Sequence, residues 1–224
     1  MSDIPFDVIA FDLDGTLADT APDLAASLNH TLAALGRPTV PPESVYKLVG
    51  HGARALLRRG LGASGDAPDE LVERGFPIFI EYYAANICAG TKAYPGLEEA
   101  LDALVAAGVR TAVCTNKPEG LTHTLLEALG WTGRFNAVVG GDTLPTRKPD
   151  PAMLFEAIAR AGGGRAAFVG DSSVDAGTAR ATGLPFVAVS FGFADVPVSE
   201  LGADAVIDHH SELIPALRSL RMRC

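Results

Sequence analysis

The sequence predicts an α/β protein with a Rossmann-like core, in which helices cover both faces of a parallel sheet to give three layers, and an all-helical domain inserted near the start of the chain. Short apolar runs rich in β-branched residues alternate with helix-like segments over most of the sequence. Continuous rather than alternating hydrophobicity is typical of strands buried on both faces, and regular alternation of strand and helix indicates a parallel sheet.

The first predicted strand is the run FDVIAF at residues 6–11. Similar runs follow, with the sequences VRTAVC, AVVG, AAFVG, PFVAVS and ADAVID. The helix-like segments between and after them are residues 97–107, 119–129, 151–161, 174–182 and about 212–220. The larger part of the chain is therefore expected to consist of successive strand–helix units.

One region departs from this alternation. Between about residues 18 and 89 the sequence shows several helical patterns and no convincing strand, with prolines where the first turn of a helix tolerates them. We therefore expect a core domain made of residues 1–17 and 90–224, and a helical insertion of residues 18–89.

Composition narrows the class of protein. A hydrophobic fraction of 48% with 20% charged residues is ordinary for a globular protein, and the net charge of −9 argues against nucleic acid or an anionic membrane as a partner. The three cysteines are far apart and form no CxxC pair, which disfavours a disulfide framework and a zinc site. Because no signal peptide or membrane-spanning run is visible, we expect a cytoplasmic protein.

Polar side chains follow four of the predicted strands at the points where the strands end. In open parallel sheets, ligands bind in the crevice beyond these carboxyl ends, so such residues are the candidates for a site. They are Asp12, Asp14, Gly15 and Thr16 after the first strand, Thr115 and Asn116 after VRTAVC, Lys148 in RKPDP, and Asp171, Ser172 and Asp175 after AAFVG.

These residue types favour phosphate chemistry. Converging carboxylates are typical of a site for Mg²⁺, which takes oxygen ligands and commonly shares them with a substrate phosphate. Lys148, Thr115 and Asn116 are suited to hold the phosphate itself. One aspartate can serve as a nucleophile and a second as a general acid and base.

Each position also has an ordinary structural explanation. Asp12 and Asp14 could form a turn, Thr115 could cap a helix, Lys148 could be solvated, and Asp175 could cap the helix that follows it. Four independent coincidences at four strand ends are improbable, so a functional site is the favoured interpretation.

The motifs DLDGT at residues 12–16, TN at 115–116, KP at 148–149 and GDSSVD at 170–175 resemble, in order and spacing, those of the haloacid dehalogenase superfamily, and the resemblance extends over nearly the whole chain. It implies a haloacid dehalogenase-like core. It also implies that Asp12 is the nucleophile and Asp14 the general acid and base, and that Mg²⁺ is held by Asp12, Asp171 and the backbone carbonyl of Asp14.

The same resemblance implies roles for the remaining motif residues. Thr115, Asn116 and Lys148 are expected to bind the phosphate, and Asp175 to orient Lys148 or metal-bound water from behind. The helical insertion corresponds to the cap domain of the superfamily, which closes over the substrate. Hinges for that closure are expected near residues 18–20 and 90–95.

Branches of the superfamily with other chemistry fit less well. The dehalogenases lack the second aspartate of the first motif, so Asp14 favours phosphoryl transfer. Phosphonate-cleaving relatives use a lysine of the cap, and Lys47 stands outside any such pattern.

Among phosphatases, the sequence is most similar to bacterial-type phosphoglycolate phosphatases. The similarity rests on the stretches DTAPDLAASLNHTLAALG, VGHGARALL, YPGL and VVGGDTLPTRKPDP. It implies hydrolysis of 2-phosphoglycolate to glycolate and phosphate through a phosphoaspartyl intermediate. The partner would be a small phosphorylated metabolite, and the protein would be a monomer or a homodimer.

Two other possibilities remain open at the level of sequence. One keeps the chemistry but acts on another small phosphate ester or on pyrophosphate, as a phosphatase or a phosphomutase. The other is a phosphate-binding regulatory protein without catalysis.

The loop Gly50-His51-Gly52 opens a predicted helix of the insertion, where glycines allow close backbone approach and exposed N–H groups attract an anion. Because a substrate such as 2-phosphoglycolate also needs its carboxylate bound, we expect His51 or Arg54 to bind that group.

Overall fold

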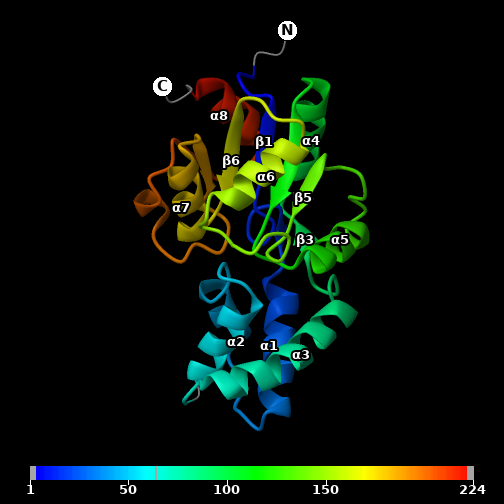
Figure 1. Cartoon of the computed structure of the whole chain (residues 1–224), viewed down its shortest axis with the longest axis vertical. Coiled ribbons are helices and arrows are strands. Elements are labelled where there is room, and N and C mark those ends of the chain that lie inside the picture. Colours follow the sequence, from blue (N-terminus) through cyan, green and yellow to red (C-terminus); the bar gives the residue numbers. More distant parts are fainter. Residues whose placement is uncertain (1–3, 64, 221–224) are drawn as a thin grey trace.

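The computed structural model describes residues 4–63 and 65–220, which form a core built on a sheet and a helical insertion that lies beyond one end of that sheet (Figure 1). The core sheet has six strands in the order β5-β4-β1-β6-β7-β8, and all neighbouring pairs are parallel. The strands are β1 (Val8–Phe11), β4 (Arg110–Cys114), β5 (Ala137–Val139), β6 (Ala166–Gly170), β7 (Phe186–Val189) and β8 (Ala205–Ile207).

The strand order places a ligand crevice at the centre of the sheet. The chain moves outward from β1 to β4 and β5, and then crosses to β6 on the other side of β1. Ligands of open parallel sheets bind at such a change of direction, beyond the carboxyl ends of the strands. The ends of β1, β4 and β6 are therefore the expected location of a site.

Helices cover both faces of the sheet, which confirms the predicted three layers. They are α4 (Leu97–Ala106), α5 (Glu119–Ala128), α6 (Ala152–Arg160), α7 (Ser173–Thr182) and α8 (Leu213–Ser219). Side chains of β1 alternate between the faces, because successive residues of a strand point in opposite directions. Ile9 and Phe11 join the apolar cluster of α4, α5 and α8, whereas Val8 and Ala10 join that of α6 and α7.

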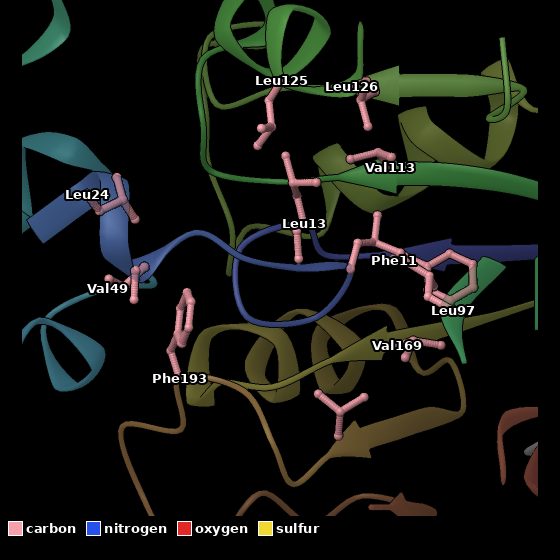
Figure 2. Close-up of a cluster of buried hydrophobic side chains, with 14 of the residues drawn as sticks. Phe11, Leu13, Leu24, Val49, Leu97, Val113, Leu125, Leu126, Val169 and Phe193 are labelled. Atoms are coloured by element: carbon pink, nitrogen blue, oxygen red, sulfur yellow. The ribbon is translucent and has the colours of Figure 1, made fainter. Parts of the chain in front are cut away.

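The first of these clusters continues from the sheet into the helical insertion. Figure 2 shows Phe11 and Val113 over the sheet, and Phe193 beside Leu24 and Val49 of the insertion. Since buried apolar side chains cross the boundary, both parts of the molecule share one hydrophobic core.

The insertion contains α1 (Ala21–Ala34), the 3-10 helix η1 (Pro42–Lys47), α2 (Ala53–Gly62) and α3 (Asp69–Ala85). Its helices pack closely where glycines replace larger side chains. A Cβ atom at Gly60 would lie 2.6 Å from Leu28 Cδ1, so a larger residue there would require Leu28 to move or α1 and α2 to separate. None of the helices within residues 4–63 and 65–220 is long and apolar enough to cross a membrane.

The expectation of no strand between residues 18 and 89 is wrong at its first edge. The two-residue strand β2 (Ala18–Asp19) pairs antiparallel with β3 (Lys92–Ala93), and this short ribbon carries the chain into and out of the insertion. Two residues are too few to show a periodic pattern, and the pairing depends on a segment more than 70 positions away. The exact domain boundaries stay a prediction.

Smaller differences concern the ends of elements. The first strand begins at Val8 rather than at residue 6, and the helix-like segment after Pro41 is the 3-10 helix η1 rather than an α-helix. Element ends are the least certain part of any prediction from pattern.

Asp23 of α1 connects the insertion to the returning chain. It is buried, and its carboxylate accepts hydrogen bonds from the backbone N–H groups of Gly90 (2.8 Å) and Thr91 (2.9 Å) and from the Thr91 hydroxyl (2.6 Å). Hydrogen bonds to a charged acceptor are stronger than neutral ones, and losing the acceptor leaves buried donors unsatisfied.

We predict that Asp23→Ala lowers the free energy of unfolding by about 3 kcal/mol, measured by urea denaturation, because three donors, two of them buried, lose their acceptor. Asp102→Ala is the matched control, since Asp102 is exposed and its ion pair with Arg134 is worth little, at most about 0.5–1 kcal/mol. Equal losses in the two variants would contradict the role of Asp23.

Candidate active site

Three carboxylates meet beyond the ends of β1 and β6. Asp12 follows β1, and Asp171 and Asp175 follow β6, with Phe11 and Val169 aligned in the pairing of the two strands. One oxygen from each of the three carboxylates lies within 4.8 Å of the others, and all three residues are buried. The adjacent parallel strands therefore bring together acids more than 150 positions apart in the chain.

Lys148 supplies positive charge to this cluster. Its Nζ lies 2.9 Å from Asp12 Oδ1 and 2.7 Å from Asp175 Oδ1, and its side chain is buried. With all groups ionised, three negative charges face one positive charge. The cluster therefore has a deficit of positive charge in a place where water cannot screen it.

Asp175 has two structural tasks at once. Its Oδ2 accepts hydrogen bonds from the Asp171 N–H (3.2 Å), the Ser172 N–H (3.1 Å) and the Ser172 hydroxyl (2.6 Å), which forms a capping box at the start of α7. Its Oδ1 accepts from Lys148 Nζ. The helix-cap explanation and the lysine-orienting explanation from sequence are thus compatible in one side chain.

The charge deficit appears in the pKa values of the acids. Burial raises the pKa of Asp12 to about 7, while Lys148 pulls it down and Asp175 pushes it up. Burial, together with Asp175 and Asp12, raises the pKa of Asp171 well above its ordinary value. Burial alone would lower the pKa of Lys148, but Asp12 and Asp175 outweigh it and hold that pKa above its usual range. A further cation would stabilise the ionised acids.

The donor set fits a divalent cation that prefers oxygen. Asp12 and Asp171 present buried carboxylates, and Asp171 is held in place by the Thr16 hydroxyl (2.9 Å) and the Phe193 N–H (2.6 Å). Gly15 has a φ of +87°, and a Cβ atom there would lie 2.3 Å from Asp171 Oδ2, so only glycine fits this turn. The role predicted for the Asp14 carbonyl stays a prediction.

Asn116 and Thr115 follow β4 at the same edge of the sheet. Asn116 Oδ1 accepts from the Lys148 N–H (3.0 Å), and its Nδ2 donates to the carbonyls of Lys148 (3.2 Å) and Gly50 (3.4 Å). Asn116 therefore positions the backbone that carries Lys148. The Thr115 hydroxyl accepts from the Lys117 N–H (3.2 Å), and Thr115 lines the cavity described next.

A small cavity of about 40 Å³ lies between the core and the insertion, which is room for a few water molecules. Asp12, Asp14, Thr115 and Asn116 line it on the core side. Its wall on the insertion side is mainly apolar, with Leu24, Val49, Leu56, Phe79, Ile80 and Tyr83. The predicted nucleophile and general acid therefore line the same cavity.

Lys117 is a residue of this cavity that the sequence interpretation missed. Its buried Nζ lies 3.0 Å from Asp14 Oδ1 and donates to the Tyr83 hydroxyl at 2.8 Å. The Thr20 hydroxyl also donates to Asp14 Oδ1, at 2.7 Å. The position of Lys117 directly after Thr115 and Asn116, at the same strand end, was the signal in the sequence that could have identified it as a residue of the site.

His51 and Arg54 lie elsewhere. Arg54 pairs with Glu73 (2.9 Å) on the exposed side of the insertion and lies over the ring of Phe76. His51 Nε2 lies 3.8 Å from Asp195 of the core. Neither residue is among those that line the cavity, whereas Gly50 and Gly52 are. A role for His51 or Arg54 in substrate binding stays a prediction.

His210 supports the turn after Asp14 from the far end of the chain. It is buried, and its Nε2 lies 2.9 Å from the Thr16 carbonyl oxygen, so this nitrogen carries the proton and donates. Burial lowers the pKa of His210 to about 4, which keeps the ring neutral near pH 7. No local pattern in the sequence indicates this contact.

A parallel α/β core with an acid cluster and a buried lysine at the strand ends, facing an inserted helical domain, defines a hydrolase of the haloacid dehalogenase type. The family described as haloacid dehalogenase-like hydrolase matches residues 9–189, and the chain belongs to this family. This confirms the resemblance inferred from the four motifs.

Within this family, the chain is similar to several phosphoglycolate phosphatases. A phosphoglycolate phosphatase from Agrobacterium fabrum is 45% identical over 210 residues, which cover 92% of this chain and 90% of that protein. One from Mesorhizobium japonicum is 44% identical and covers 96% of each chain. Among solved structures, a predicted phosphoglycolate phosphatase from Haemophilus somnus 129PT aligns with a TM-score of 0.88 at 31% identity, covering 96% of this chain and 98% of that one.

We predict a specific pH dependence for Asp12 in protein freed of metal by a chelator. The pKa of this carboxyl rises from 3.8 to about 7 on folding, so the folded state binds its proton more tightly. Its contribution to stability therefore falls as the pH rises between these values. Because asparagine does not titrate, Asp12→Asn should become progressively more stable than the unaltered protein from about pH 4 to about pH 8.

Urea denaturation of both proteins across this pH range measures the difference between their free energies of unfolding. His210 is present in both proteins, so its contribution, whose pH dependence has the opposite sign, cancels in this difference. A difference that does not change with pH would contradict the buried, unneutralised state of Asp12.

Proposed function

We propose that this protein is a magnesium-dependent phosphatase that converts 2-phosphoglycolate to glycolate and phosphate. The observation that carries the proposal is the arrangement of Asp12 and Asp14 at one small cavity, with Asp12 in the acid cluster and Asp14 beside the apolar wall. The identity of 44–45% to curated phosphoglycolate phosphatases over nearly the whole chain supports the choice of substrate.

In the first half of the reaction, Asp12 attacks the phosphorus atom. Its carboxylate is oriented by the Leu13 N–H (2.7 Å) and by Lys148 Nζ (2.9 Å). The bond between phosphorus and the ester oxygen breaks, and a phosphoaspartyl intermediate forms on Asp12. Asp14 serves as the general acid of this step and gives a proton to the departing glycolate oxygen.

In the second half, Asp14 acts as a base. It takes a proton from a water molecule, which attacks the phosphorus atom and breaks its bond to Asp12. Phosphate leaves, Asp12 is regenerated as a carboxylate, and Asp14 is again protonated. Thr20 and Lys117 both contact Asp14 Oδ1, so they hold the carboxyl group that must serve both steps.

Asp12, Asp171 and the backbone carbonyl of Asp14 would hold Mg²⁺, which when bound supplies positive charge against the transferring phosphoryl group and the surrounding acids. Lys148 adds a second positive charge and is kept in place by Asp175. Thr115, which lines the cavity, would donate its hydroxyl to a phosphate oxygen. The proposed groups therefore neutralise the charge that would otherwise repel the nucleophile.

The cavity favours a small monoester over the other candidate substrates. Its volume of about 40 Å³ and its apolar wall suit a short tail, and pyrophosphate would place a second highly charged group against that wall. All proposed catalytic side chains come from a single chain, so a monomer or a homodimer suffices.

We predict that Asp12→Asn lowers phosphate release from 2-phosphoglycolate by at least about 10³-fold, because the amide cannot act as the nucleophile. Asp102→Asn, at an exposed acid on α4, should leave the rate unchanged. Release of inorganic phosphate in the presence of Mg²⁺ is the measurement. Activity that survives in Asp12→Asn would disprove the phosphoaspartyl route.

We predict that chelation with EDTA abolishes activity and that added Mg²⁺ restores it. In Asp171→Asn the Mg²⁺ concentration for half-maximal activity should rise by at least about 10-fold, because a carboxylate of the acid cluster is lost. The rate is titrated against Mg²⁺ for both proteins. If neither protein releases phosphate from any small ester, yet calorimetry shows that the ligands bind, a regulatory phosphate-binding role replaces the enzyme.

A further inference from the structure

Lys117 places one ammonium group at the boundary between the core and the helical insertion. Its Nζ contacts Asp14 of the core at 3.0 Å and the hydroxyl of Tyr83, on α3 of the insertion, at 2.8 Å. It also lies 4.5 Å from the centre of the Tyr83 ring. The side chain is only 4% exposed, so few other groups compete for this charge.

The charge pattern of the cavity leaves one position for a second anionic group of a substrate. Among the described residues that line the cavity, Asp12 and Asp14 have acidic side chains, and Lys117 is the one with a cationic side chain. An anionic tail would be repelled by the Asp12 carboxylate and find no partner on the apolar wall. Lys117 is therefore the group that such a tail would contact.

The chemistry of 2-phosphoglycolate brings its carboxylate to the same place. One carbon atom separates the ester oxygen from the carboxyl carbon. The group that protonates the ester oxygen must therefore lie next to the carboxylate. If that group is Asp14, a cation 3.0 Å from its Oδ1 is within reach of the carboxylate.

Lys117 and Tyr83 both retain hydrogen-bond capacity for such a ligand. An ammonium group has three donors, and two of them are directed to Asp14 and Tyr83 among residues 4–63 and 65–220. The Tyr83 hydroxyl accepts from Lys117 and keeps its own proton, because burial raises the pKa of Tyr83 to about 12. Two donors, one from each domain, are thus available side by side.

We propose that Lys117, with Tyr83 as the second donor, binds the carboxylate of the substrate and so determines the preference for 2-phosphoglycolate; this inference rests on the proposed function. Lys117 would then contact the carboxylate of the substrate from the core, at the strand end that also carries Thr115. Tyr83 would contact the same carboxylate from the insertion when the insertion closes over the substrate. Arg54 and His51, the candidates from sequence, contact Glu73 and Asp195 instead and are not among the residues that line the cavity.

The test compares two substrates that differ in the tail alone. Ethyl phosphate has a methyl group where 2-phosphoglycolate has its carboxylate. For the unaltered protein and for Lys117→Met, kcat/KM is measured on both substrates. The readout is the ratio of kcat/KM for 2-phosphoglycolate to kcat/KM for ethyl phosphate. The ratio should fall by about 10- to 100-fold in Lys117→Met, as expected for loss of a hydrogen-bonded charge pair. Lys92→Met, the matched loss of an exposed lysine on β3, should leave the ratio unchanged.

This ratio distinguishes binding of the substrate carboxylate by Lys117 from a role of Lys117 in holding Asp14 alone. If Lys117 only holds Asp14 in place, Lys117→Met slows both substrates equally, the ratio stays constant, and the proposal is overturned while the phosphatase function stands. A fall of the ratio in Arg54→Met but not in Lys117→Met overturns it as well. If the unaltered protein does not hydrolyse 2-phosphoglycolate, the proposed function itself fails.

Thermal denaturation checks whether Lys117→Met folds. Two further measurements test the proposal if it does not. Tyr83→Phe retains the ring and should lower the ratio several-fold in the same direction. In the unaltered protein, 2-aminoethyl phosphate, whose tail is cationic, should be hydrolysed more slowly than ethyl phosphate because Lys117 repels it. Equal kcat/KM for all three esters would overturn the assignment.

Discussion

Repulsion among the buried carboxylates beyond β1 and β6 is the constraint on which the rest of this structure depends. Asp12, Asp171 and Asp175 crowd into one small volume, and Lys148 neutralises only part of their charge. The surroundings are organised to tolerate this. Asn116 holds the backbone of Lys148, and backbone and hydroxyl donors satisfy the oxygens of Asp171 and Asp175. The remaining deficit favours the binding of a further cation.

The helical insertion adds a second wall to this strand end. Its helices place apolar side chains opposite the acids, and this low-polarity wall strengthens the electrostatic interactions beside it. The insertion is joined to the core by the β2–β3 ribbon, by Asp23 and by a shared apolar core. The hydrogen bond between Lys117 and Tyr83 is a further contact between the domains, and this contact lies beside Asp14, the proposed general acid.

Much of the fold and of the site was predictable because it follows from local pattern. Apolar runs indicated the six core strands, and polar residues directly after β1, β4 and β6 indicated Asp12, Thr115 and Asp171, whereas Lys148 lies nine residues beyond the end of β5. What escaped prediction depends on partners distant in the chain. The β2–β3 ribbon is too short for a periodic signal, His210 contacts Thr16 across almost the whole sequence, and Lys117 resembles any other lysine until Tyr83 and Asp14 are placed around it.

The sequence by itself determined the parallel sheet, the position of the helical insertion and the chemical identity of the residues at the strand ends, because burial period and strand termini are properties of neighbouring residues. Only the tertiary structure decided which charges meet. Arg54 and His51 stand in a glycine-rich loop and helix that suggested anion binding, yet they pair with Glu73 and Asp195, whereas Lys117 reaches the cavity. Side-chain direction and pairing depend on how α2 and α3 pack over the core, and no local pattern encodes that packing.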